Sequence, residues 1–132
     1  VAYYPLSSDS TLYYGENQDA ELIRWPIIYD ESNQPAAFKY GTFIGGDQPY
    51  TVIENPAFTD GSSCVVIKES YGNAFVPFLV DHYQTVYVLD CRHWEGSISD
   101  FVKTNGVSEV IFVNNLSAIR SSYIINNLHD IL

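Results

Sequence analysis

Ser70 occupies the position in this chain that is best suited to chemistry. It follows the apolar run 64–68, which has the composition of a buried strand, and precedes the apolar segment 73–83, which we expect to be a helix. In sheets whose strands alternate with helices, ligands bind beyond the carboxyl ends of strands and at helix N-termini. A serine there can be a nucleophile if one group removes its proton and others stabilise the oxyanion. It can equally be a helix cap.

Hydrogen-bond donors for such an oxyanion could come from two loops. The candidate oxyanion or substrate-binding residues are Lys68, Tyr71, Gly72, Asn73, Asn114 and Asn115. Backbone N–H groups at a helix start can donate to an anion, and a glycine permits close approach. The two asparagines follow the apolar run 109–113 and would reach the same sheet edge if that strand neighbours the strand 64–68. Ser, Gly and Asn are also ordinary turn and cap residues, and spacing alone favours that interpretation.

Three histidines are candidates for the proton acceptor. His93 is the best of them, because it follows the predicted strand 85–89 at the carboxyl edge and has Asp90 three residues before it. His82 lies at the end of a predicted helix, where a cation is favoured by the helix dipole. His129 lies near the C-terminus. We expect each of them to be a surface or capping residue more often than a catalyst.

Composition excludes several classes of partner. The chain has 132 residues, sixteen acidic and six basic side chains, and a formal net charge of −10. Nucleic acid and anionic membrane are excluded because both require clustered Lys and Arg. We expect no membrane span and no cofactor, since no apolar run approaches 20 residues and two cysteines do not make a metal site.

Cysteine, tyrosine and methionine usage bears on the environment of the protein. Eleven tyrosines and no methionine favour an extracytoplasmic location, secreted or on the cell surface. Cys64 and Cys91 lie at strand ends, which suggests buried thiols, although adjacent parallel strands could also bring them close enough for a disulfide. The chain starts at Val1 with no signal peptide, as expected for a mature protein or an excised part of one.

The pattern of elements predicts a single α/β domain over residues 1–132, a three-layer sandwich with a parallel sheet. Residues 1–60 are expected to be irregular, with strands at 2–5, 11–14, 24–29, 39–44 and 50–54, the first two forming a hairpin. Residues 61–132 predict three β/α units: strands at 64–68, 85–89 and 109–113, and helices at 73–83, 98–105 and 118–132. Ser97 or Ser99 would cap the second helix and Gly106 would end it.

Several segments resemble the DHHW protein family. They are Lys-Glu-Ser-Tyr-Gly-Asn-Ala-Phe-Val-Pro-Phe-Leu at 68–79, Tyr-Val-Leu-Asp-Cys-Arg at 87–92, Val-Ile-Phe-Val-Asn-Asn at 110–115, and the upstream segment 43–53. These bacterial surface or secreted proteins are related to SGNH hydrolases and to alginate O-acetylation proteins. The resemblance implies a flavodoxin-like sandwich with Ser70 in the nucleophile position, and counterparts for Gly72, Asn73 and, more loosely, Asn115.

The resemblance also implies an Asp-His pair upstream of the serine, and this sequence has no Asp-His-His-Trp motif there. The segments 81–83 and 92–94 lie downstream and do not match it. Either a longer chain supplies the pair or a shortened homologue has lost it. We therefore expect O-acyl (acetyl) ester hydrolysis or transfer on a surface carbohydrate, weak or absent in these 132 residues.

A non-catalytic module that binds carbohydrate or protein at the cell surface is the alternative function. Aromatic faces stack on sugar rings, and the chain offers Trp25, Tyr50, Tyr71, Tyr83 and Trp94. Core packing explains these residues equally well, and we expect it for Tyr71 and Tyr83. A receiver-like signalling domain is less consistent, because Lys-Glu-Ser occupies a strand end where an acidic cluster would be needed.

Overall fold

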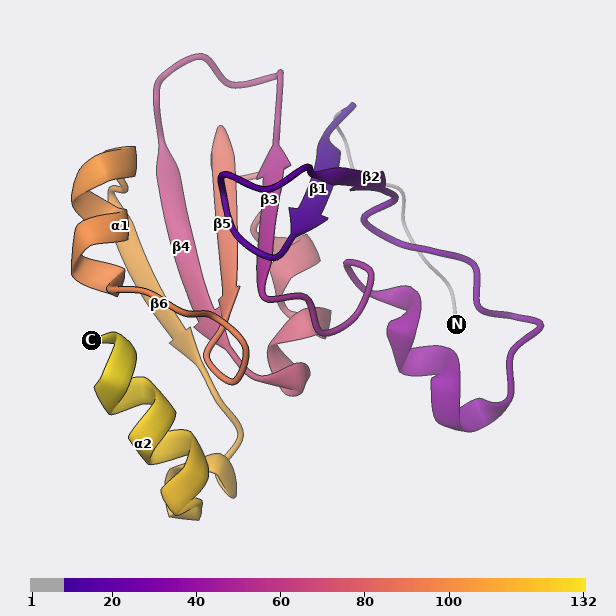
Figure 1. Cartoon of the computed structure of the whole chain (residues 1–132). Helices are drawn as coiled ribbons and strands as arrows, with labels where there is room; N and C mark the ends of the chain where they lie inside the picture. Colours follow the sequence, from indigo (N-terminus) through magenta and orange to yellow (C-terminus); the bar gives the residue numbers. More distant parts are fainter. Residues whose placement is uncertain (1–8) are drawn as a thin grey trace.

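The computed structural model describes residues 9–132, which form one six-stranded sheet in the order β2-β1-β3-β5-β4-β6 (Figure 1). The strands are β1 Thr11–Gly15, β2 Ile23–Trp25, β3 Tyr50–Glu54, β4 Ser63–Lys68, β5 Thr85–Asp90 and β6 Glu109–Val113. β5 and β6 both run parallel to β4, with Lys68 opposite Asp90 on one side and Val113 on the other. The parallel alignment of these three predicted strands is thus confirmed.

The predicted fold class is wrong. β1, β2 and β3 are not irregular segments beside a parallel sheet; they extend that sheet by antiparallel pairing, with β3 hydrogen-bonded to β5. The sheet is therefore mixed, and the described chain is mostly β with few helices. Sequence pattern identified β3 as a strand, but the residues with which it pairs in β1 and β5 are all more than about 30 positions away, and pairing over that range leaves no local signal.

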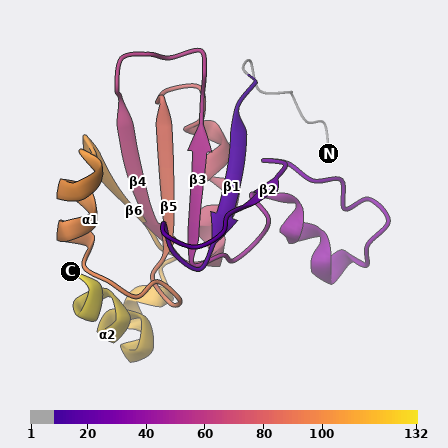
Figure 2. The same cartoon turned by 45° about the horizontal axis from the view of Figure 1, so that its top comes forward.

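Two α-helices lie on the same face of the sheet (Figure 2). α1 (Ile98–Asn105) has the predicted bounds: the Ser97 hydroxyl accepts the N–H of Asp100, and Gly106 ends the helix with φ of 61°. α2 spans Ser122–Ile131 rather than 118–132, because Ser121 caps it and a separate 3-10 turn, η4 (Ala118–Arg120), precedes it. Both helices bury apolar side chains in the core cluster that also contains Val65 and Ile67 of β4.

The opposite face of the sheet is covered by 3-10 turns where a helix was predicted. The segment 73–83 contains the end of η2 (Ser70–Ala74), η3 (Val76–Phe78) and further turns, and the N–H groups of Phe75, Phe78, Leu79 and His82 each donate to the third carbonyl before them. Pro77 lacks the N–H that an α-helix would need at this point. Val76 and Val80 nevertheless pack in the core beneath β4 and β5. The predicted helix is therefore wrong, although the apolar composition that suggested it does mark a buried segment.

The first half of the chain departs further from the predicted elements. Residues 39–44 belong mainly to η1 (Ala36–Thr42) instead of a strand, and only Phe43 makes an isolated bridge, to Ile28. Pro26 ends β2 after three residues, as expected for an edge. The predicted strand 2–5 lies outside the described residues, so its hairpin with β1 stays a prediction.

β6 is the edge strand next to β4, the strand that precedes Ser70. Within residues 9–132 it pairs with β4 alone. Strands of a three-layer sandwich are covered on both faces, yet in β6 Val110 is 41% and Phe112 50% exposed. Leu116, in the loop that follows, is 79% exposed. No helix in the described part of the chain is long and apolar enough to cross a membrane.

Candidate functional site

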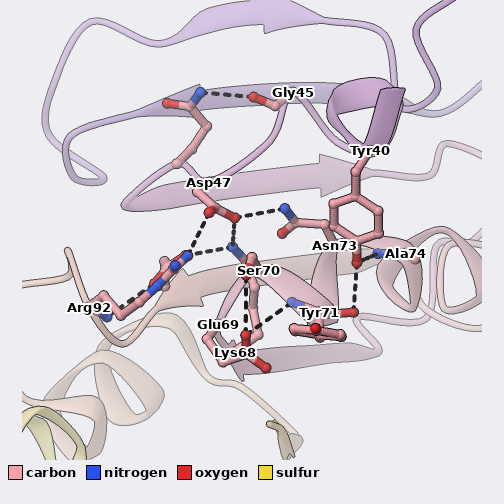
Figure 3. A network of polar contacts seen from close by, with 12 residues as sticks. Tyr40, Gly45, Asp47, Lys68, Glu69, Ser70, Tyr71, Asn73, Ala74 and Arg92 are labelled. Carbon is pink, nitrogen blue, oxygen red and sulfur yellow. Dashed lines mark hydrogen bonds and ion pairs between the residues drawn. The ribbon is translucent and has the colours of Figure 1, made fainter. Parts of the chain in front are cut away.

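Ser70 is the first residue of η2 and lies directly beyond the carboxyl end of β4. Its side chain is half-buried, and its hydroxyl donates a hydrogen bond of 3.3 Å to Glu69 Oε2 (Figure 3). The residue that caps η2 is Glu69, not Ser70, because the Glu69 carboxylate accepts the N–H of Tyr71. The Ser70 hydroxyl is therefore not used to cap a helix in this structure.

Glu69 joins the ends of two parallel strands. Its side chain is 4% exposed, and its second carboxylate oxygen accepts the backbone N–H of Asn115 at 2.9 Å. Because β6 lies beside β4, the loop 114–115 emerges next to the Ser70 turn, as the sequence predicts for neighbouring strands. Asn115 Oδ1 accepts hydrogen bonds from Ser117 and Ala118 and so holds the turn into η4. Asn114 Oδ1 is buried and has no hydrogen-bond partner within residues 9–132.

Lys68, a candidate for oxyanion or substrate binding in the sequence, is buried at the end of β4. Its side chain is 1% exposed, and its ammonium lies 2.8 Å from Asp90 Oδ2 and 3.6 Å from Asp47 Oδ1. Arg92 completes the group, with its guanidinium 2.8 Å from Asp47 and 2.5 Å from Asp90. Two cations thus neutralise two carboxylates, as buried charges require. We call Asp47, Lys68, Asp90 and Arg92 the charge network.

The charge network fixes the loop that precedes β3 against the Ser70 turn. Asp47 belongs to that loop, where Ile44, Gly45 and Gly46 all have positive φ. Besides the two cations, Asp47 accepts a 2.8 Å hydrogen bond from the Asn73 side-chain amide in η2 (Figure 3). Asn73 is 1% exposed, and its Oδ1 has no hydrogen-bond partner in the described chain.

Stability in acid should depend on this network. Burial raises the pKa of Asp90 and of Asp47, but hydrogen bonds from Arg92 and the charge of Lys68 outweigh it and hold both pKa values below the usual 3.8. The stability these carboxylates contribute is complete above their unfolded pKa and is lost as pH falls through it towards the folded pKa. We expect urea unfolding to show constant stability from pH 7 to about 5 and a steep loss below about 4.

Two variants test whether the network causes this loss of stability in acid. Asp47→Asn should start from lower stability and lose less between pH 5 and 3, whereas Asp100→Asn, at a side chain 79% exposed, should leave the slope unchanged. Equal slopes in wild type and Asp47→Asn would contradict the role assigned to this carboxylate.

Gly72 lies against the stem of Lys68. A Cβ at residue 72 would stand 2.5 Å from Lys68 Cβ, closer than real side-chain atoms approach. Its N–H donates to the carbonyl of Glu69, and the N–H of Tyr71 is held by the Glu69 side chain. Two of the backbone donors expected near an oxyanion are therefore engaged within the turn itself. Tyr71, expected in the core, is 68% exposed, and its carbonyl accepts the Tyr40 hydroxyl.

His93 lies at the same sheet edge but makes no hydrogen bond to Ser70 in the described structure. It is exposed in the loop after β5 and lines a cavity of about 890 Å³, together with Asp47, Arg92 and Trp94. Ser70 is not part of that lining. His82 and His129 are exposed, the latter in the last turn of α2. The structure therefore brings Ser70, Lys68, Asn73 and Asn115 into one neighbourhood and leaves His93 beside it.

Sequence reasoning missed the central role of Asp47, Glu69, Asp90 and Arg92. A signal was present for two of the network residues, because Lys68 and Asp90 end strands that are otherwise apolar and occupy equivalent register positions. Charged residues at such buried ends are seldom left unpaired. Asp47 gave no such signal, since its contact with β4 depends on how the preceding loop folds.

The two cysteines are free and buried. Burial raises the pKa of Cys64 to about 12 and that of Cys91 to about 11, so neither thiol ionises near neutral pH. No group of three or more His, Cys, Asp or Glu residues able to hold a metal ion occurs in the described part of the chain.

Comparisons with known proteins identify the family and the fold. The sequence matches the DHHW protein family over residues 1–89. A crystal structure of a DHHW family protein from Eubacterium siraeum is similar to this chain with a TM-score of 0.83 and 34% identity, covering 98% of this chain and 43% of that protein.

Two structures of Bacillus cereus PatB1 share the fold at lower identity. One has a TM-score of 0.69 and 23% identity. The other, which carries a sulfonyl adduct, has a TM-score of 0.66 and 24% identity. Each match covers 89% of this chain and 39% of PatB1. No curated protein matches the sequence. The chain thus spans less than half the length of these solved proteins. The family match extends over most of the chain and includes the Ser70 turn, so the chain belongs to the DHHW protein family.

Proposed function

We propose that Ser70 is the nucleophile of an SGNH-hydrolase-like domain that hydrolyses or transfers an O-acyl group, acetyl being the simplest, on a cell-surface carbohydrate. The observation that carries the proposal is the position of the Ser70 hydroxyl: half-buried, directly beyond β4, and not engaged in capping. Membership of the DHHW family supports it, as does the sulfonyl adduct of PatB1, since sulfonyl groups form adducts on nucleophilic side chains.

The proposed chemistry needs a proton acceptor that the described residues do not place at Ser70. No histidine is hydrogen-bonded to its hydroxyl within residues 9–132, and His93 faces the neighbouring cavity. The solved relatives are more than twice as long as this chain. We therefore propose that the Asp and His come from polypeptide outside this sequence, and that the 132 residues alone react slowly.

A fluorophosphonate probe tests the nucleophile directly. Wild-type protein should gain one adduct, found by mass spectrometry on the peptide that contains Ser70, and Ser70→Ala should gain none. Ser121→Ala is a matched control, because that serine caps α2 and lies away from the turn. Equal labelling of wild type and Ser70→Ala would remove the nucleophile from this account.

A binding module remains the second candidate, favoured by one observation. Tyr71, which follows Ser70, and Phe78, in η3, are 68% and 74% exposed and offer aromatic faces to solvent. Tyr50 and Trp94, also considered for stacking, are buried in the core at 4% and 8%. Glycan binding that survives Ser70→Ala and is lost in Tyr71→Ala would favour this function over catalysis.

A further inference from the structure

Glu69 has an unusual environment for a carboxylate. It is 4% exposed, and no Lys, Arg or His of the described chain pairs with it. Lys68, its neighbour in sequence, directs its ammonium to Asp90 and Asp47 instead. A buried carboxylate without a cation is costly unless hydrogen bonds compensate, so its retention requires a reason.

The compensation comes from three donors that converge on this one side chain. The Ser70 hydroxyl and the Tyr71 N–H donate to Oε2 at 3.3 Å and 3.2 Å, and the Asn115 N–H donates to Oε1 at 2.9 Å. Two of the donors belong to the Ser70 turn and the third to the loop after β6, 46 residues later. Glu69 therefore determines both where the Ser70 oxygen points and how close the Asn114–Asn115 loop lies.

We propose that Glu69 is a positioning residue for Ser70, and this rests on the proposed function. In this structure its carboxylate accepts the hydroxyl hydrogen and so holds the Ser70 side chain in one rotamer until a base takes that hydrogen. By holding the Asn115 N–H it also keeps the β6 loop beside the nucleophile. Its negative charge does not stabilise an oxyanion, so its contribution is geometric.

The contribution is measurable as a labelling rate. Hydrogen bonds to a charged acceptor are strong enough that Glu69→Gln should slow fluorophosphonate labelling of Ser70 about tenfold or more. The glutamine has nearly the same shape, but its amide group would face one of the donors that the carboxylate accepts. Glu69→Asp keeps the charge but has a shorter side chain, so its labelling rate should lie between those of wild type and Glu69→Gln. Glu54→Gln, at an exposed carboxylate, is the control and should label like wild type.

A second readout separates positioning from general stability. In proton–nitrogen correlation spectra, the amide signals of Tyr71 and Asn115 should move upfield in Glu69→Gln, because both lose a charged acceptor. The signal of Gly106, which ends α1, should stay in place. If Glu69→Gln does not fold, Glu69→Asp provides the same two measurements.

The outcomes distinguish this inference from the proposed function. Equal labelling of wild type and Ser70→Ala overturns the nucleophile, and with it the catalytic meaning of Glu69. Labelling that depends on Ser70 but is unchanged by both Glu69 variants overturns the positioning role alone. A slower rate with unmoved Tyr71 and Asn115 signals also overturns it, because the effect would then not act through these hydrogen bonds.

Discussion

Lys68→Met is expected to lower the free energy of unfolding by about 3 kcal/mol, which is the range for breaking a buried ion pair by removing one partner. Lys68 is 1% exposed, and its main partner Asp90 is 0% exposed. Methionine fills a similar volume, so the loss reflects the charge rather than a cavity. Arg92 still contacts Asp90 after the change, and we therefore expect the lower part of the range.

Urea denaturation at pH 7 measures this loss, and Lys103→Met is its control. Lys103 is 76% exposed and 4.0 Å from Asp100, so its replacement should change stability by about 0.5 kcal/mol or less. If the free energy of unfolding of Lys68→Met were within about 1 kcal/mol of the wild-type value, the charge network would not need both cations. Adding Asp47→Asn should cost less in Lys68→Met than in wild type, because the two residues interact.

Gly72→Ala is expected to destabilise the fold by about 2 kcal/mol, in the range of overpacking. The added methyl group would meet Lys68 Cβ at 2.5 Å and Cγ at 3.1 Å. The Lys68 Cβ can move only with the backbone of β4, so either the end of that strand or η2 must shift. Because Ser70 lies between these two points in the chain, we also expect slower fluorophosphonate labelling of Ser70.

Gly41→Ala gives the comparison for this glycine. The nearest atom to its added methyl group is Glu31 Oε1, at the ordinary distance of 3.6 Å. Thermal and urea unfolding should place this variant within about 0.5 kcal/mol of wild type. If Gly72→Ala proves as stable as Gly41→Ala, the contact with Lys68 is not a constraint on the turn.

The elements predicted best are those whose signals are local. β4, β5 and β6 are continuous apolar runs, and short connections with a helix between strands favour parallel pairing. α1 has both of its boundary residues in the sequence, Ser97 and Gly106. Nothing from distant parts of the chain is needed to identify either feature.

The parts predicted wrongly depend on contacts that sequence pattern does not encode. The apolar segment 73–83 has the composition of a buried element, but Pro77 and the tight packing of Gly72 on Lys68 favour 3-10 turns. Residues 39–44 alternate like a strand, yet they lie mainly in η1, and the loop that follows is fixed through Asp47 by charges on β4 and after β5. β3 joins the sheet through β5, far along the chain.

The candidate site, too, could be predicted from the sequence only in part. The position of Ser70 and the proximity of Asn115 could be anticipated from strand ends alone. The burial of Glu69 and its three donors could not, because they require the side-chain directions at the end of β4. A carboxylate beside a serine gives the same sequence signal whether it is in solvent or inside the fold.

The open side of β6 has a geometric consequence for any polypeptide that lies along it. Neighbouring strands in a sheet are about 4.8 Å apart, so a seventh strand would run roughly 10 Å from β4 and end level with residue 70. Of the two edges that the sheet has within residues 9–132, the β6 edge therefore lies nearer to the serine.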